Sequence, residues 1–325
     1  MTRKFPVATQ AVAQGILFLL IIGVVTFVDL PGDSKLMGEM QNTAHSFVFS
    51  LLAWLALSFM RQRRQLKTSH AFLPYLAAFA ICLLLGVAIE LAQALVHRDA
   101  DAWDVLRDVA GVTSFLGLYS LWDRNNIYAR AGASKSKILV AAASVSVLLA
   151  ALFPAARITY AYVGRELAFP VLMDFASRWH SSFVSTNHAQ LNVVAAPQDW
   201  QAASGKLVAK LTLHRARYPG IECKDLHPDW TGFTDFSLSI FSPNPTPFPL
   251  IIRIHDQKHT FAMNDRFNRR LLIVPGENVI RIPLAVIQAA PARRRMDMQA
   301  IKAVILFAPG LKQDTTVYLR DIRLN

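Results

Sequence analysis

The sequence contains little cysteine and no motif that assigns a chemical reaction. Its 325 residues include two cysteines, Cys82 and Cys223, and we expect them in different parts of the fold, so no internal disulfide is predicted. Neither cysteine has neighbours at the spacing of a metal site. No nucleophile elbow, HExxH zinc motif or phosphate-binding glycine loop occurs. Enzymatic activity therefore has no sequence signature here, although these absences do not exclude it.

Charge is also scarce, and apolar residues gather in the first half of the chain. Charged residues make up 17% of the sequence and hydrophobic residues 53%. The apolar runs are long enough to cross a bilayer, which takes about 20 residues per helix. We therefore predict a polytopic α-helical membrane bundle of about five transmembrane helices, the first retained rather than cleaved as a signal peptide. The predicted spans are 11–30, 44–60, 72–96, 105–122 and 138–155.

Basic residues in the short predicted loops indicate the orientation of this bundle. Lys and Arg are enriched in the cytoplasmic loops of membrane proteins. Here they concentrate before the first span, after the second and after the fourth. We therefore predict a protein of the bacterial inner (cytoplasmic) membrane with a cytoplasmic N-terminus and a periplasmic or extracellular C-terminal domain. The residues that indicate this are Arg3, Lys4, Arg61, Arg63, Arg64, Lys67, Arg124, Arg130, Lys135 and Lys137.

After the predicted helices, the pattern changes to short alternating runs separated by turns rich in Pro and Gly. The run "LIIRIHD" alternates apolar residues with Arg253 and His255, and "KLVAKLTL" places Leu207, Ala209, Leu211 and Leu213 on one face. Such alternation is typical of β-strands. We predict an all-β sandwich of jelly-roll type. The predicted domains are a transmembrane domain (1–125), a cytoplasmic loop with the fifth helix and a linker (126–165), and the extracytoplasmic β-sandwich (166–325).

Ionisable residues lie at the predicted outer ends of three helices. Glu90 and Gln93 share one helix face with His97, and Asp104 shares another with Asp108. Charge near a bilayer is costly, so these groups should face a protein interior or a wet cavity. They either form a pocket that binds a headgroup, phosphate or glycan, or join the helices through ion pairs and hydrogen bonds. The predicted rim pocket contains His45, Glu90, Gln93, His97, Arg98, Asp104 and Asp108.

The same residues carry a resemblance to a known family. Glu90, Gln93, Arg98, Asp104, Asp108 and Gly111, with His45 and two phenylalanines (Phe47, Phe49) earlier, resemble the signature of the VanZ-like family over about residues 11–125. The family pattern usually has Asn at the position of Asp108, and an Asp-Lys pair where this chain has Gln41 and Asn42. The resemblance implies a polytopic protein of the cell envelope. It also suggests a link to glycopeptide (teicoplanin-type) antibiotic resistance.

The C-terminal region resembles galactose-binding-like, carbohydrate-binding β-sandwich modules over about residues 168–325. The matching segments are "DWTG", "RIHD", "DRF", "PGEN" and "YLRDIRL". The resemblance implies glycan binding and a structural Ca²⁺ held partly by Asp321, with Asp174 as the candidate partner. Trp230 is either a stacking platform for sugar or a core residue, and Arg253 and His255 either bind glycan or form a solvated strand face. The candidate glycan-binding residues are Trp230, Arg253, His255, Asp256, Asp265, Arg266 and Arg269.

Three functions are consistent with these observations. The first is an envelope protein that binds a lipid-linked or anionic cell-wall or glycan component, such as a membrane lipid or a polysaccharide. The second is a membrane enzyme acting on a glycolipid or polyprenyl-linked substrate, with Glu90, His45 and Asp104 in acid–base roles. The third is a structural scaffold for the β-sandwich. The net charge of +12 favours an anionic partner, and an exported domain is not expected to meet nucleic acid.

Overall fold

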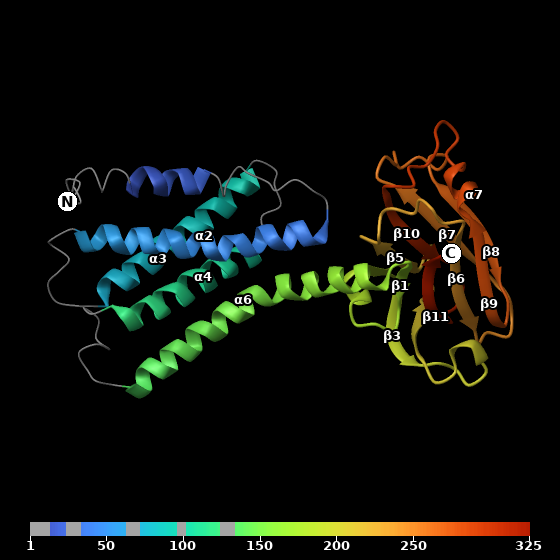
Figure 1. The fold of residues 1–325 in the computed structure, drawn as a ribbon, viewed down its shortest axis with the longest axis horizontal. Coiled ribbons are helices and arrows are strands. Elements are labelled where there is room, and N and C mark those ends of the chain that lie inside the picture. The colour runs from blue at the N-terminus through green and yellow to red at the C-terminus, as the bar shows by residue number, and fades with distance from the viewer. Residues whose placement is uncertain (1–13, 24–33, 63–71, 96–101, 124–133) are drawn as a thin grey trace. The chain divides into compact units, whose positions relative to one another are not determined.

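The computed structural model describes residues 14–23, 34–62, 72–95, 102–123 and 134–325. The chain divides into two compact units, Met1–Ile158 and Thr159–Asn325, and the division falls inside the segment predicted to link the two domains. The first unit is helical and the second is built of β-strands (Figure 1). Two predicted rim residues, His97 and Arg98, lie outside the described residues.

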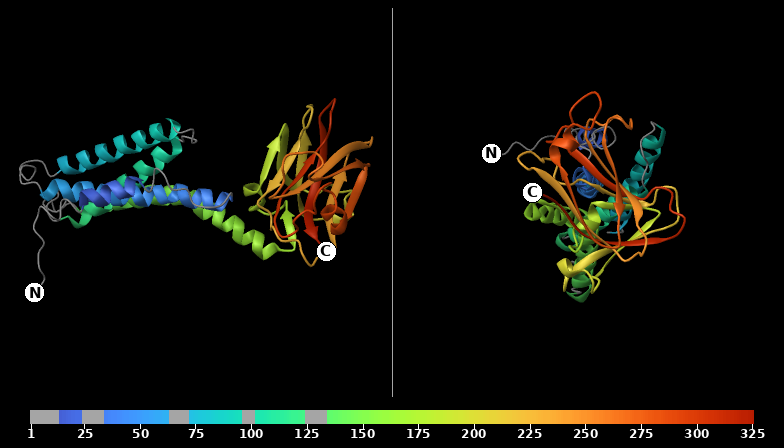
Figure 2. Two further views of the ribbon diagram at one scale, coloured as in Figure 1. Left: turned by 90° about the horizontal axis from the view of Figure 1, so that it is seen from above. Right: turned by 90° about the vertical axis from the view of Figure 1, so that its right-hand side faces the viewer.

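Three long helices form the core of the first unit. Helices α2 (Lys35–Gln62), α3 (Leu73–Leu95) and α4 (Ala102–Trp122) pack against one another, and Figure 2 shows them from two further directions. Gly111 of α4 allows a close approach to α2, because a Cβ atom there would lie 2.0 Å from the carbonyl oxygen of Ser46. Ser50 donates a hydrogen bond to the Gly111 carbonyl at 3.0 Å. Small and hydroxyl side chains at such contacts are typical of helices that pack within membranes.

Three of the described helices are long and apolar enough to cross a membrane: Lys35–Arg61, Leu73–Leu95 and Lys135–Ala168. This differs from the prediction of about five spans. A shorter apolar helix, Gln14–Gly23, lies within the first predicted span, whose remaining residues fall outside the described part. Helix α4 does not qualify, because its first two turns carry Asp104, Arg107 and Asp108. The structure therefore has a helix in each of the five regions predicted to span the membrane, as far as those regions are described. Three of these helices are long and apolar enough to be spans.

Helix α6 (Ser134–Ala168) extends well beyond the predicted fifth span, which ended at about residue 155. It continues through Pro154 because a proline removes only one intrahelical hydrogen bond, and apolar helices tolerate that loss. Its last turns belong to the second unit. There the Arg165 guanidinium donates to the carbonyl oxygen of Asp225 at 2.7 Å and lies 4.5 Å from the centre of the Tyr162 ring.

The second unit is an antiparallel β-sandwich, as predicted. One sheet has the order β3 (Ala189–Ala195), β4 (Leu207–Leu213), β11 (Thr315–Leu324), β6 (Asp235–Ser242) and β9 (Gly276–Pro283), with β1 (Val171–Asp174) also paired to β11. The other has the order β2 (Val184–Asn187), β5 (Gly220–Lys224), β10 (Ile301–Phe307), β7 (Phe248–Asp256) and β8 (Phe267–Ile273). The short helices are η2 (His180–Ser182), η3 (Gln201–Ala203) and α7 (Leu284–Gln288).

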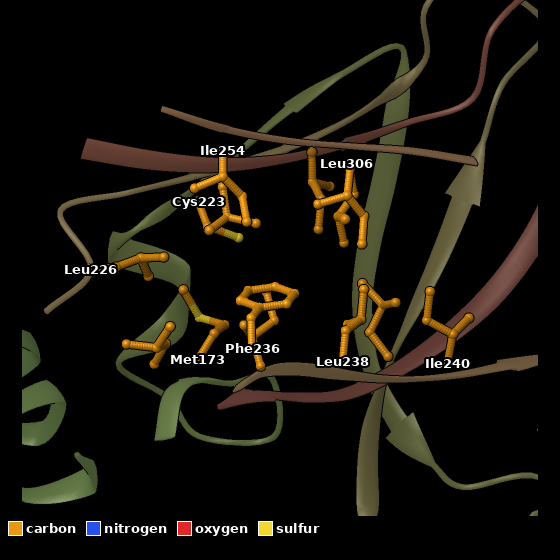
Figure 3. Close-up of a cluster of buried hydrophobic side chains, with 14 of the residues drawn as sticks. Met173, Cys223, Leu226, Phe236, Leu238, Ile240, Ile254 and Leu306 are labelled. Atoms are coloured by element: carbon orange, nitrogen blue, oxygen red, sulfur yellow. The ribbon is translucent and has the colours of Figure 1, made fainter. Parts of the chain in front are cut away.

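The core of the sandwich lies between the two sheets. Figure 3 shows Ile254, Cys223 and Leu306 of the five-stranded sheet opposite side chains of the six-stranded sheet, among them Phe236, Leu238 and Ile240. The predicted alternation holds along β7, whose inward residues are buried and whose outward residues are half-buried. Along β4 two residues differ. Leu207 is 54% exposed at the start of the strand. Val208, on the opposite face from the main core, is buried in a small cluster with Trp200 and Phe241. Alternation alone does not show where a strand leaves the core.

Because α2 and α4 approach closely at Gly111, we predict that substitution of this glycine destabilises the helical unit. Gly111→Ala should destabilise the unit by about 1–3 kcal/mol, because the added methyl group forces α2 and α4 apart. Gly38→Ala on α2 is the matched control, since nothing lies within 4 Å of its added Cβ and alanine favours a helix by up to about 1 kcal/mol. Thermal unfolding of the purified protein in detergent measures both. Equal stability of the two variants would contradict the close contact.

Candidate functional site

The outward face of the five-stranded sheet presents polar side chains in a row. On β7, Leu250, Ile252 and Ile254 point into the core, so Ile251 and Arg253 point outward. The register places Arg253 opposite Ile305 of β10 and Asn268 of β8, and Ile305 opposite Glu222 of β5. Side chains opposite one another in an antiparallel sheet share a face. The row therefore brings a guanidinium, an amide and a carboxylate to one surface.

These side chains line a cleft of about 650 Å³. Its floor comes from β5, β10, β7 and β8, which Figure 1 labels, and its walls from the segments next to them. The lining residues share a mixed character, with apolar, aromatic, amide and charged groups in one concave surface. They are Ser185, Thr186, Asn187, Tyr218, Gly220, Ile221, Glu222, Ile251, Arg253, Met263, Arg266, Asn268, Ile305, Phe307 and Pro309.

Two aromatic rings lie in the cleft. Phe307 is opposite Gly220 in the register, where a Cβ atom would lie 2.6 Å from the Cβ of Phe307, so only glycine fits beside this phenylalanine. The ring of Tyr218 meets that of Phe307 edge to face, with 5.8 Å between centroids. Tyr218 is 48% exposed, whereas Phe307 is 9% exposed. Tyr218 is therefore the accessible aromatic surface, and Phe307 supports it.

Two arginines give the cleft a positive wall. Arg253 donates from Nε to Oδ1 of Asn268 at 3.3 Å, and its guanidinium lies 5.1 Å from the centre of the Phe307 ring. Burial lowers the pKa of Arg253, and the charge of Arg266 lowers it further, while Glu222 opposes this. The Nε atom of Arg266 is buried without a hydrogen-bond partner, and burial also lowers the pKa of this guanidinium. The single acidic lining residue, Glu222, is paired with Lys224 at 3.0 Å.

A partly buried ion-pair network holds the segment between β7 and β8, which supplies Met263 and Arg266 to the cleft. Arg294 donates from Nη2 to Oδ1 of Asp256 at 2.8 Å and from Nε to Oδ1 of Asp265 at 2.6 Å. Asp265 also accepts from the backbone amide of Thr260 at 2.8 Å. These hydrogen bonds hold the pKa of Asp265 well below its usual range. The network therefore fixes the wall of the cleft, and it persists at neutral pH.

The structure places the predicted glycan-binding residues in three different surroundings. Arg253 and Arg266 line the cleft. His255 lies on the same face of β7, two residues from Arg253, without lining it. The remaining four do not line the cleft.

The structure shows why each of these four residues lies outside the cleft. Trp230 is fully buried, stacks on Phe236 and donates from Nε1 to the carbonyl of His227 at 2.9 Å, so it is a core residue. Asp256 is fully buried and is bound, like Asp265, to Arg294. Arg269 is opposite Ile252 in the register and so lies on the inner face of the edge strand β8. Arg270, opposite the outward Ile251, occupies the cleft side instead.

The predicted calcium ligands do not fit a calcium ion. Asp174 and Asp321 are opposite each other in the register of β1 and β11. However, Asp321 Oδ2 accepts from Nη2 of Arg323 at 2.6 Å and lies 3.5 Å from Nε of Arg320. Asp174 Oδ1 accepts from the amide of Ala176 at 3.0 Å. Calcium takes six to eight oxygen ligands, and within the described ranges no cluster of three or more His, Cys, Asp or Glu side chains could hold a metal.

In the helical unit, the described rim residues come from three helices. His45 of α2 and Asp108 of α4 are buried, with 3.3 Å between Nδ1 and Oδ1. Glu90 and Gln93 of α3 are also buried. Asp104 is bound to Arg107 at 2.5 Å, and Arg107 lies 3.7 Å from Glu39. The predicted carboxylates thus lie near an imidazole, and Arg107, which the sequence did not single out as a partner, neutralises one of them.

A second polar cluster lies at the opposite ends of the same helices and was not predicted. Arg61, at the end of α2, is paired with the buried Asp123 and donates to the hydroxyl of Tyr75 at 3.1 Å. The Tyr75 hydroxyl in turn donates to Asp123 at 2.7 Å. The ring of Tyr119 lies 5.4 Å from the Arg61 guanidinium. Arg61 belongs to the basic run that was used to predict orientation, so the sequence did not separately indicate its role in helix packing.

Comparison with known proteins shows similarity to solved structures but no sequence family. No protein-family model matches the sequence, so the VanZ-like resemblance stays a prediction. No curated protein matches it either. The β-sandwich is similar to domains found in 82 solved chains.

Three of these illustrate the range. An exo-beta-agarase has 18% identity and a TM-score of 0.39, and the match covers 48% of this chain and 24% of the agarase; the chain thus spans about a quarter of that protein. A family 11 carbohydrate-binding module from Clostridium thermocellum, solved with a mixed-linked tetrasaccharide, has 12% identity and a TM-score of 0.37 over 47% of this chain and 93% of the module. A family 30 carbohydrate-binding module of a cellulosomal cellulase from the same organism has 10% identity and a TM-score of 0.30 over 44% and 90%. A likeness at these scores says nothing about the ligand of this chain.

His255 predicts a pH dependence of the β-sandwich. Burial, the imidazole of His259 and the charge of Arg253 lower its pKa to about 4, with Arg266 adding to this effect and Asp256 opposing it. In the unfolded chain its pKa is about 6.5, so the unfolded state binds the additional proton as the pH falls from about 6.5 to about 4. Stability contributed by neutral His255 is complete above this window and is lost through it, by roughly 1–3 kcal/mol.

The variant His255→Gln should remove this part of the pH dependence. Thermal unfolding of the wild-type protein and the variant near neutral pH and near pH 4 measures the difference. The wild-type protein should lose more stability on acidification than the variant does. An equal loss in both would show that His255 does not remain neutral in the folded sandwich.

Proposed function

We propose that this protein binds a glycan in the cleft on the five-stranded sheet. The observation that carries the proposal is a concave surface of about 650 Å³ in which an exposed tyrosine lies beside amide and guanidinium groups. Binding sites for small ligands are typically concave, largely apolar, and lined by a few convergent polar groups. A pyranose ring offers both an apolar face and hydroxyl groups. The apolar face suits Tyr218, and the hydroxyl groups suit the polar residues around it.

The polar groups are suited to hydroxyl recognition because the sheet holds them in place. Asn268 accepts from Arg253 through its side-chain oxygen, which fixes the orientation of its amide. Asn187 donates to the carbonyl of Tyr218 at 2.9 Å, which ties the segment that bears the tyrosine to β2. The site is therefore ordered before a ligand arrives.

Tyr218→Ala should weaken polysaccharide binding by at least about tenfold, because it removes the accessible ring and leaves the sheet unchanged. Tyr160→Ala is the matched control, since Tyr160 is 60% exposed on α6 and lies outside the cleft. The full-length protein in detergent is titrated with a panel of soluble polysaccharides by calorimetry. Unchanged affinity in Tyr218→Ala, or an equal loss in the control, would place the binding elsewhere.

We further propose that the helical unit anchors this cleft at a bacterial membrane, with the β-sandwich outside the cytoplasm. Large apolar side chains are exposed on its helices, including Leu84 (70%), Leu139 (71%) and Phe153 (65%). Such exposure is unfavourable in water, and contiguous apolar surface of this kind marks a membrane or protein contact. The distribution of Lys and Arg in the loops supports the orientation. A reporter fused at the C-terminus that is active only outside the cytoplasm tests this orientation.

A second candidate function concerns the rim cluster of the helical unit, His45, Glu90, Asp104 and Asp108. The buried His45 and Asp108 lie 3.3 Å apart on different helices. Placing ionisable residues inside a membrane protein costs free energy, and such residues often mark a ligand site. We propose that this cluster engages the headgroup of a lipid or a lipid-linked glycan. Glycopeptide resistance stays a prediction from the VanZ-like resemblance, and drug susceptibility of cells lacking the protein tests it.

Asp108→Asn tests the rim cluster. If the cluster binds a headgroup, the variant should retain at least about tenfold less co-purifying lipid, measured by native mass spectrometry, because a charge is removed from a buried pair. Asp123→Asn is the matched control, since Asp123 is buried in the cluster at the opposite helix ends.

The outcomes of this test separate the three functions considered from the sequence. Loss of lipid in Asp108→Asn alone supports headgroup binding. Loss of folding in both variants indicates a structural scaffold. Retained lipid with loss of turnover of a glycolipid would indicate an enzyme.

A further inference from the structure

We propose that the ligand of the cleft is an acidic polysaccharide, whose carboxylate or sulfate groups are bound by Arg253 and Arg266. This inference rests on the proposed glycan-binding function and goes beyond it by naming the chemical class of the glycan. Three observations carry it: the balance of charge around the cleft, the unmet hydrogen-bonding capacity of one arginine, and the shape of the surface.

The balance of charge is positive. Arg253 and Arg266 line the cleft, and Arg270 lies on the same face of the sheet, opposite Ile251. At the rim, the Arg217 guanidinium lies 5.2 Å from the centre of the Tyr218 ring. Glu222 is the one acidic residue among those that line the cleft, and Lys224 is its partner. A concave surface lined by one sign of charge concentrates ligands of the opposite sign.

The two lining arginines lie close enough for their charges to interact, and among the described residues neither forms an ion pair with a carboxylate. The structure pairs Arg253 with a neutral amide and leaves the Nε atom of Arg266 buried without a partner. Elsewhere in the same unit, Arg294 and Arg323 are paired with aspartates. Two like charges in a half-buried site oppose each other, so an anion that bridges them is favoured. Guanidinium groups bind carboxylate and other oxyanions through paired, parallel hydrogen bonds.

The shape favours a polymer over a membrane surface. The lining residues come from all five strands of the sheet, β2 included, and from the segments flanking them, so the surface is a recess with a tyrosine in its wall. A bilayer is flat and could reach the rim arginines but not the floor at Phe307, which is 9% exposed. A sugar chain can enter, place a ring against Tyr218, and direct its acidic group toward Arg253 and Arg266.

Paired polysaccharides that differ only in charge test the inference. The full-length protein in nanodiscs of neutral lipid is titrated with polygalacturonate and with its methyl ester, and with dextran sulfate and dextran. We expect at least about tenfold tighter binding of one acidic polymer than of its neutral partner. Raising the salt concentration should weaken that binding, since ionic screening acts on charge pairs.

Variants of single residues connect this preference to the cleft. Arg253→Gln and Arg266→Gln should each remove about tenfold of the affinity for the acidic polymer and little of the affinity for the neutral one. Arg253→Lys should restore part of it, because the charge is kept and the paired hydrogen bonds are lost. Glu222→Gln should increase the affinity, since it removes the acidic lining residue. Arg269→Gln is the matched control, because Arg269 is an exposed arginine on the inner face of the neighbouring strand β8.

The outcomes distinguish failure of this inference from failure of the proposed function. Equal affinity for the charged and neutral polymers, with loss of both in Tyr218→Ala, overturns the acidic specificity and leaves glycan binding intact. No binding of any polysaccharide overturns both. If phosphatidylglycerol vesicles compete for the cleft and this competition depends on Arg253 and Arg266, the ligand is a lipid surface and the acidic polysaccharide is overturned as the ligand. If Arg269→Gln lowers the affinity for the acidic polymer as much as the cleft variants do, the effect is one of overall charge, and the assignment of binding to the cleft is overturned.

Discussion

The β-sandwich depends on one constraint, the alternation of side chains along β7 and its neighbours in an antiparallel register. Leu250, Ile252 and Ile254 face the core on one side of the sheet, and Ile251 and Arg253 face outward on the other. Because the same backbone serves both faces, a shift of one residue would bury Arg253 and expose Ile252. The core therefore fixes the register, and the register in turn fixes which polar groups meet in the cleft.

The two units place charge in different ways. In the helical unit, charged groups form two clusters, one where His45 meets Asp108 and one where Arg61 meets Asp123, and apolar side chains form a separate core. In the β-sandwich, Arg294 is bound between two aspartates, whereas the arginines of the cleft have no carboxylate of this kind. Paired charges contribute to structure in both units, and the incompletely paired charges of the cleft are the ones available to a ligand.

The sequence was sufficient for a helical part followed by a β-sandwich, whereas the membrane location of the helices stays a prediction and the site was predicted only in part. Alternation predicted the strands, and it placed Arg253 on a polar face. It could not place Glu222 or Asn268 beside Arg253, because that requires the register between strands. Trp230 and Asp256 were only candidates for sugar binding, because their partners Phe236 and Arg294 become neighbours only through tertiary packing. Tyr218 lies in the connection between β4 and β5, where strand periodicity gives no information. The pairing of His45 with Asp108 likewise needs the packing of two helices.

The network around Arg294 lets one wall of the cleft vary in sequence while the floor stays fixed. The floor is part of the sheet and cannot change without disturbing the core. One wall, however, is the segment between β7 and β8, which is attached through the carboxylates of Asp256 and Asp265 to a single guanidinium. Between these attachment points lie exposed residues such as Phe261 and Met263. Substitution or lengthening of this stretch would therefore alter which ligands the proposed site accepts while the scaffold keeps its stability, so ligand preference and fold can change independently.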